Sequence, residues 1–156
     1  MTGGSASNDY GSRLRAGRNS SIMEGNNGAT AMAKKIAAAN IKLKRAYRAA
    51  SPTDGTRILI DRLWPRGVKK ADAAIELWAK ELAPSTELRQ WFNHDPERWA
   101  EFRRRYADEV RQHRAQFDSL GELARQGVIT LVFAAHDEAH NNAVVMRDLL
   151  LGRSPA

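Results

Sequence analysis

Two short runs of polar and aromatic residues hold the side chains best suited to binding or chemistry. The first run, Asp61 to Arg66, follows one apolar segment, and the second, His136 to Asn141, follows another. An arginine guanidinium can hold a carboxylate or phosphate through two parallel hydrogen bonds, and imidazole and amide groups can orient other polar atoms of a ligand. We therefore expect a site for a small anionic, phosphorylated ligand. The candidate ligand-binding residues are Arg62, Trp64, Arg66, His136, His140 and Asn141.

Asp61 and Asp137 are the candidate catalytic residues, because each run contributes one of them and paired carboxyl groups can perform general acid–base catalysis. A structural explanation is equally open. Asp61 could pair with Arg62 and hold its loop, and Asp137 could cap the helix that follows it. No Ser-His-Asp arrangement is recognisable, so the sequence does not decide whether the protein is an enzyme.

The chain contains no cysteine, which excludes disulfides, thiolate nucleophiles and cysteine-ligated metal centres. Asp137 and His140 have the spacing of two metal ligands on one helix, but a third ligand would have to come from Asp61 or His94. Because a histidine near the start of a helix is more often a surface residue, we expect no metal site. We also expect no cofactor.

An arginine-rich segment offers a second hypothesis, a nucleic-acid-associated module whose helix follows a phosphate backbone. Acidic residues are interspersed, and a pair such as Glu101 with Arg105 has the spacing of an ion pair along a helix. A solvated helix face is therefore favoured over nucleic-acid binding. A protein-interaction domain without a pocket is the third hypothesis. The arginines concerned are Arg98, Arg103, Arg104, Arg105, Arg111 and Arg114.

Composition limits the class of protein. The formal net charge of +7 at pH 7 favours anionic partners without choosing among them. The longest apolar run, Val128 to Ala135, is interrupted by Thr130 and is far shorter than the roughly 20 residues of a membrane-spanning helix. The first residues contain no apolar segment typical of a secretion signal. We expect a cytoplasmic protein that does not associate with a membrane.

Three strands are expected to position the two runs. Residues 41–45 alternate between apolar and basic types, as in a strand with one solvated face. Residues 57–60 and 128–134 are almost wholly apolar, which is typical of strands covered on both faces. The two candidate runs directly follow these two buried strands.

Helices are expected between and after the buried strands. Apolar spacing predicts a helix at 75–82, and Ser85 is expected to cap a second, short helix. Asp95-Pro96 begins a long helix, which Gly121 is expected to interrupt and Gly127 to end.

A last helix is expected to run from its cap at Asp137 to Leu151. Strand, helices, strand and helix in this order predict an α/β fold: a small, mainly parallel sheet with helices packed on both faces, in Rossmann-like layers. Residues 1–38 are rich in Gly, Ser, Asn and Ala and are predicted to be a disordered extension, and residues 39–152 to form a single α/β domain.

Ligands of open α/β sheets bind beyond the carboxyl ends of the strands. If the two buried strands are parallel neighbours, the Asp61–Arg66 run lies beside the start of the last helix. A short link from Tyr47 to Arg57 favours a hairpin on length alone. A parallel first strand would instead bring Lys44 or Tyr47 toward the same edge.

Several motifs resemble one known family. They are Lys44-Arg45-Ala46-Tyr47, Ser51-Pro52-Thr53-Asp54-Gly55, Ile60-Asp61-Arg62-Leu63-Trp64-Pro65-Arg66-Gly67, Trp78-Ala79-Lys80-Glu81-Leu82-Ala83-Pro84-Ser85, Trp91-Phe92-Asn93-His94-Asp95-Pro96 and Asp137-Glu138-Ala139-His140-Asn141. From Ile41 to about Leu150 the chain is similar to the YeaO-like branch of the domain-of-unknown-function 488 family. The resemblance implies a small cytoplasmic bacterial protein with an α/β fold, no established substrate, and a parallel first strand.

The chain departs from this family's pattern at several positions. Longer relatives carry a cysteine and a glutamate where Phe133 and Ala135 stand, and a His-Cys-His-Arg run where residues 140–143 read His-Asn-Asn-Ala. Any thiol or glutamate chemistry of those relatives is therefore not expected here. Close members usually have Arg or Lys at His136, and an acidic residue followed by prolines at 48–50. The histidine implies weaker anion binding at high pH, because a neutral imidazole does not replace a fixed charge.

Overall fold

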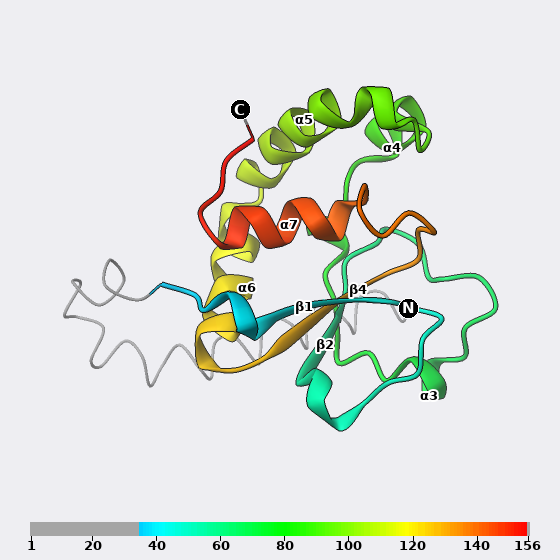
Figure 1. The fold of residues 1–156 in the computed structure, drawn as a ribbon, viewed down its shortest axis with the longest axis vertical. Coiled ribbons are helices and arrows are strands. Elements are labelled where there is room, and N and C mark those ends of the chain that lie inside the picture. Colours follow the sequence, from blue (N-terminus) through cyan, green and yellow to red (C-terminus); the bar gives the residue numbers. More distant parts are fainter. Residues whose placement is uncertain (1–34, 156) are drawn as a thin grey trace.

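The computed structural model describes residues 35–155 and contains a four-stranded sheet (Figure 1). The strands are β1 (Ile41–Arg45), β2 (Thr56–Leu59), β3 (Leu77–Trp78) and β4 (Ile129–Phe133), in the spatial order β1-β4-β2-β3. All neighbouring strands run parallel, and both Ile41 and Thr56 lie beside Ile129. The predicted α/β class, the pairing of the two buried strands and the parallel first strand are confirmed.

The longer helices lie together on one side of the sheet (Figure 1). They are α4 (Thr86–Phe92), α5 (Trp99–Arg111), α6 (Arg114–Gln126) and α7 (Asn142–Leu150). The remaining helical segments are single turns: η1 (Ala38–Asn40), η2 (Pro52–Asp54), α3 (Lys70–Ala73), η3 (Lys80–Leu82) and η4 (Pro96–Arg98).

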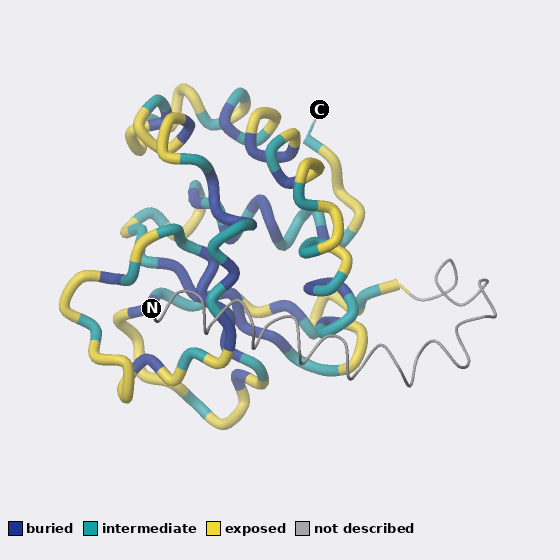
Figure 2. The backbone as a smooth tube through the Cα atoms, turned by 180° about the vertical axis from the view of Figure 1, so that it is seen from behind, coloured by how far each residue is buried: buried dark blue, intermediate teal, exposed yellow. Residues whose placement is uncertain are grey.

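Successive residues of the central strands point into two different packed layers. Ile58 and Leu131 face the longer helices and are buried with Tyr106 of α5 and other core residues. Leu59 and Val132 point to the opposite face of the sheet. This face is covered mainly by the connection from β2 to β3, which includes α3. Figure 2 shows buried residues through the middle of the molecule, and β4 is buried along its whole length. The residues of the second layer are Ala46, Leu59, Val132, Trp64, Val68, Ile75 and Trp78.

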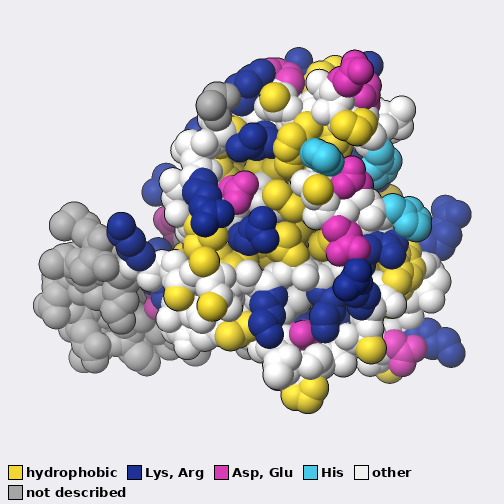
Figure 3. Space-filling model, viewed as in Figure 1, with side chains coloured by type: hydrophobic (Ala, Val, Ile, Leu, Met, Phe, Trp, Pro, Cys, Tyr) yellow, Lys and Arg dark blue, Asp and Glu magenta, His cyan; other side chains and the backbone are white. Residues whose placement is uncertain are grey.

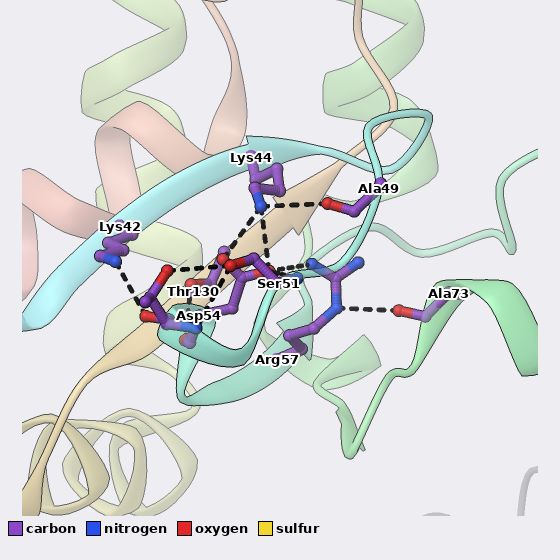
Figure 4. A network of polar contacts seen from close by, with 9 residues as sticks. Lys42, Lys44, Ala49, Ser51, Asp54, Arg57, Ala73 and Thr130 are labelled. Carbon is purple, nitrogen blue, oxygen red and sulfur yellow. Dashed lines mark hydrogen bonds and ion pairs between the residues drawn. The ribbon is translucent and has the colours of Figure 1, made fainter.

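A buried carboxylate organises this second face of the sheet (Figure 4). Asp54 accepts from Arg57 Nη1 at 2.7 Å and from Lys44 Nζ at 2.9 Å. Both Asp54 and Arg57 are almost wholly buried. Since a buried charge is stable only with a partner, Asp54 allows the basic side chains of two strands to lie beneath the loops that cover this face.

The same turn is fixed by its backbone. Ser51 N–H donates to the Asp54 carboxylate at 3.0 Å, and Thr130 of β4 donates to the Asp54 carbonyl at 2.7 Å. Gly55 follows with a φ of 64°, and a Cβ there would lie 2.1 Å from the carbonyl oxygen of Val128. Only glycine fits this approach of the turn to the start of β4.

The predicted helix at 75–82 is wrong. Residues Leu77–Trp78 form the edge strand β3, and only Lys80–Leu82 form a single 3₁₀ turn. The N–H groups of Glu76 and Ala79 donate to carbonyl oxygens of β2. The acceptors are the carbonyls of Arg57 and Leu59, respectively. The apolar spacing reflects alternation instead, because Leu77 packs against the main core and Trp78 against the second layer.

The predicted break in the long helix is misplaced. Gly121 lies inside α6, which is continuous from Arg114 to Gln126, with Gly127 at its C-terminus. The helix divides instead at Gln112 and His113, where His113 has a non-helical φ of −119° and ψ of 49°. Of the predicted disordered extension, residues 1–38, the part from 1 to 34 lies outside the described residues. Ile36 already packs against the core.

Replacement of Asp54 by asparagine is expected to destabilise the protein by about 3–5 kcal/mol at neutral pH, because it leaves Arg57 buried without a counter-charge. Urea denaturation measures this change. Asp72→Asn is the control, because Asp72 is an exposed residue of α3. Equal stability of the two variants would contradict the role assigned to Asp54.

The same variant tests a pH dependence. Burial alone raises the pKa of Asp54, but hydrogen bonds from Lys44, Ser51 and Arg57 outweigh it, so the pKa lies below the ordinary value of 3.8 for an aspartate. A lowered folded-state pKa gives stability that is present above the unfolded pKa and lost as the pH falls through the folded one. The stability of Asp54→Asn is therefore expected to fall less below about pH 4 than that of the wild type.

Candidate functional site

A pocket of about 1140 Å³ lies where β1, β2 and β4 end. It is bounded on one side by the loop after β2 and on the other by the segment between β4 and α7 and by α4. The structure brings every predicted site residue to this pocket. Those residues are Asp61, Arg62, Trp64, Arg66, His136, Asp137, His140 and Asn141.

Asp61 joins the elements that form the floor of the pocket. Its Oδ2 accepts from the backbone N–H of Ala134 at 2.9 Å, and its Oδ1 accepts from Asn142 Nδ2 at 3.1 Å. Asn142 also donates to the carbonyl of Ile60 at 2.7 Å. One carboxylate therefore connects the ends of β2 and β4 with the first residue of α7.

Burial raises the pKa of the Asp61 carboxyl, while hydrogen bonds from Asn142 and Ala134 and the charge of Arg89 reduce the shift without reversing it. The carboxyl therefore keeps a proton to a higher pH than an exposed aspartate does. Because both oxygens already accept hydrogen bonds, these contacts give Asp61 a positioning role. A catalytic role for it stays a prediction.

The N-cap of the last helix is Asn141, not Asp137 as predicted. Asn141 Oδ1 accepts from the N–H of Val144 at 3.1 Å, and its amide group donates to the carbonyl of Asp137 at 2.9 Å. Asp137 instead closes the turn before the helix, where its carboxylate accepts from the N–H groups of Ala139 and His140. These hydrogen bonds and the contact with the His140 ring lower the pKa of Asp137.

Histidine side chains gather over the segment between β4 and α7, beside Lys and Arg side chains (Figure 3). His140 Nδ1 lies 2.9 Å from Asp137 Oδ2, and its ring meets that of Trp99 edge-on at 5.1 Å. His136 is exposed. His94 reaches the pocket from the end of α4, where it has a positive φ of 55°.

Four arginines line the pocket, and two of them are held by the backbone. Arg62 donates to the carbonyls of Pro84 and Ala83 at 3.1 and 3.3 Å. Arg45 donates to the carbonyls of Ala135 and Ala134 at 2.9 and 3.3 Å. These guanidinium groups are fixed at the wall with part of their donor capacity already used.

The other two arginines, Arg66 and Arg89, are exposed, and their guanidinium groups form no hydrogen bond or ion pair with any residue from 35 to 155. Arg89 was not predicted as a site residue, because only the packing of α4 brings it to the pocket. Of the two residues expected at this edge from a parallel first strand, Tyr47 lines the pocket. Lys44 does not line the pocket, because its side chain points to the face of the sheet that carries the second layer and pairs there with Asp54.

The arginine-rich segment is largely neutralised by its own acidic residues. Arg104 and Arg105 both pair with Glu101, and Arg111 pairs with Asp108 one turn before it. Such exposed pairs add little stability but reduce the positive field along the helix. The arrangement agrees with a solvated face.

Two other classes of site, a metal centre and a membrane-spanning helix, are absent from the described residues. Within residues 35–155, no group of three or more His, Asp or Glu side chains is arranged to hold a metal ion. In the same range, the helices are too short or too polar to cross a membrane.

The fold and the pocket define an α/β domain with a ligand-sized cavity at the carboxyl edge of a parallel sheet. Residues 40–155 match the family model described as the inactive DUF488-N3 subclade, and the chain belongs to this family. It is 44% identical to the uncharacterized protein YeaO of Escherichia coli (strain K12), over 71% of this chain and 96% of that protein. It is 41% identical to the uncharacterized protein Rv3073c of Mycobacterium tuberculosis, over 72% and 95% of the two chains. No solved structure matches the chain.

The assignment of the helix cap can be tested by amide hydrogen exchange. Asn141→Ala is expected to speed exchange at the Val144 amide and to destabilise the protein by about 1 kcal/mol, because α7 loses its N-cap. Asp137→Ala should speed exchange at Ala139 and His140 and leave Val144 protected. An unchanged Val144 amide in Asn141→Ala would show that the cap contributes nothing.

Proposed function

We propose that the protein binds a small anionic, phosphorylated ligand in the pocket at the strand ends and does not convert it. The observation that carries the proposal is the excess of cationic groups in one cavity. Four arginines line it against two aspartates, and the carboxylates of both aspartates already accept hydrogen bonds within the protein.

Arg66 and Arg89 supply the unused donors. A guanidinium without a protein partner at a pocket wall can hold a phosphate through two parallel hydrogen bonds, which also fix the orientation of the ligand. Arg45 and Arg62 are held rigidly by carbonyl groups, so their charge adds to the field at no further cost in side-chain entropy.

Binding without turnover agrees with the chemistry of the lining residues. The pocket contains no cysteine, serine or lysine side chain that could serve as a nucleophile. Asp61 and Asp137, the acid–base candidates, both have hydrogen-bonding roles in the fold. The description of the family's subclade as inactive supports the same proposal.

Arg66→Gln and Arg89→Gln are each expected to weaken binding of inorganic phosphate about tenfold, which corresponds to roughly 1.4 kcal/mol for one lost charge-assisted contact. Chemical-shift titration of the ¹⁵N-labelled protein measures this affinity. Arg111→Gln is the control, because it removes an exposed arginine of α5 that lies outside the pocket. Equal affinities in all three variants, or no saturable shifts in the wild type, would refute the proposal.

His136→Arg is expected to tighten phosphate binding, because arginine adds a permanent charge and a forked pair of donors at the pocket wall. His136 is exposed there, so the longer side chain can be accommodated. The same titration measures the effect, and an affinity no higher than that of the wild type would contradict it.

A further inference from the structure

We infer that the anion carries a flat apolar body, such as an aromatic ring, which packs against the wall formed by Tyr47 and residues 63–65. This inference rests on the proposed function, because the arginines provide the anchor for the charged group. It adds the chemical class of the remainder of the ligand. The argument depends on where the exposed apolar surface of the protein lies.

Among residues 35–155, the large hydrophobic side chains that remain exposed are Tyr47 and Leu63, at 49% and 61% of their full surface. Both line the pocket. Single exposed hydrophobic residues are ordinary, but two from distant parts of the sequence that meet at one cavity form a joint apolar surface. That surface lines the same cavity as the unpaired guanidinium groups of Arg66 and Arg89.

Tyr47 is held in place by its neighbours. The guanidinium carbon of Arg45 lies 5.0 Å from the centre of the Tyr47 ring, and the hydroxyl donates to the carbonyl of Arg66 at 2.9 Å. The ring therefore stands between the end of β1 and the loop after β2. A charged group and a flat apolar surface are presented together at this position.

Trp64 continues the wall. Its indole N–H donates to the carbonyl of Val68 at 2.7 Å, and its ring meets Trp78 edge-on at 5.5 Å. The polar atom of Trp64 is thus satisfied inside the protein, and what the side chain offers the pocket is ring surface. Pro65 adds a further apolar side chain directly before Arg66.

The size of the cavity agrees with a ligand larger than a bare anion. A volume of about 1140 Å³ exceeds what a phosphate ion occupies and lies slightly above the range of roughly 300–1,000 Å³ usual for small-molecule pockets. A phosphate bound at the arginines alone would leave Tyr47 and Leu63 facing water. An aromatic body would cover them and gain the free energy of apolar burial.

Three probes separate the parts of this inference: inorganic phosphate, methyl phosphate and phenyl phosphate, titrated into the full-length protein and followed by chemical shifts. Phenyl phosphate is expected to bind at least about ten times more tightly than methyl phosphate, because its phenyl group buries more apolar surface than a methyl group does. Equal affinity of the two esters would overturn the inference and leave the proposed function standing. If none of the three probes binds, both are overturned.

Variants of Leu63 test whether the preference for phenyl phosphate over methyl phosphate arises at this wall. Leu63→Ser is expected to reduce the ratio of phenyl to methyl phosphate affinity at least threefold, and Leu63→Met, which keeps an apolar side chain, to preserve it. Leu63 is exposed, so neither change removes a core contact. A ratio that is the same in Leu63→Ser as in the wild type would overturn the assignment to this wall.

Discussion

The parallel pairing of β2 with β4 is the constraint on which the pocket depends. It places Thr56 beside Ile129 and Leu59 beside Val132, so that the two strands end together and the segments that follow them emerge at one edge. The Asp61 carboxylate then connects those segments through Ala134 and Asn142. The floor therefore depends on strand pairing and on the side chains of Asp61 and Asn142, whereas the other side chains around the cavity make none of these contacts.

The two faces of the sheet are stabilised by different means. The face toward the longer helices is a continuous hydrophobic core, whereas the opposite face combines a small apolar cluster with the buried contacts of Asp54. This division explains how β1 can carry two lysines in a sheet that is covered on both sides. Lys44 ends on the Asp54 carboxylate, and Lys42 on the carbonyl of Thr53.

The sequence predicted the central strands and the location of the pocket because continuous apolar runs mark buried parallel strands, and ligand sites lie beyond their ends. It did not predict β3, because an edge strand of two residues has no period of its own. It also did not identify the cap of α7, since Asp137 and Asn141 are both capping residues. Arg89 reaches the pocket only through tertiary packing, which no local pattern contains.

One contact at the rim bears on how a ligand would enter. The loop after β2 is tied to the end of β1 by the hydroxyl of Tyr47 and the carbonyl of Arg66, a link between exposed groups. A single hydrogen bond of this kind contributes only about 1 kcal/mol, whereas strand pairing in the sheet involves many. Breaking it releases the loop only around Arg66, because Trp64 stays packed in the second layer against Trp78. A bulky guest can therefore displace this short segment while the sheet and the tryptophan wall keep their places.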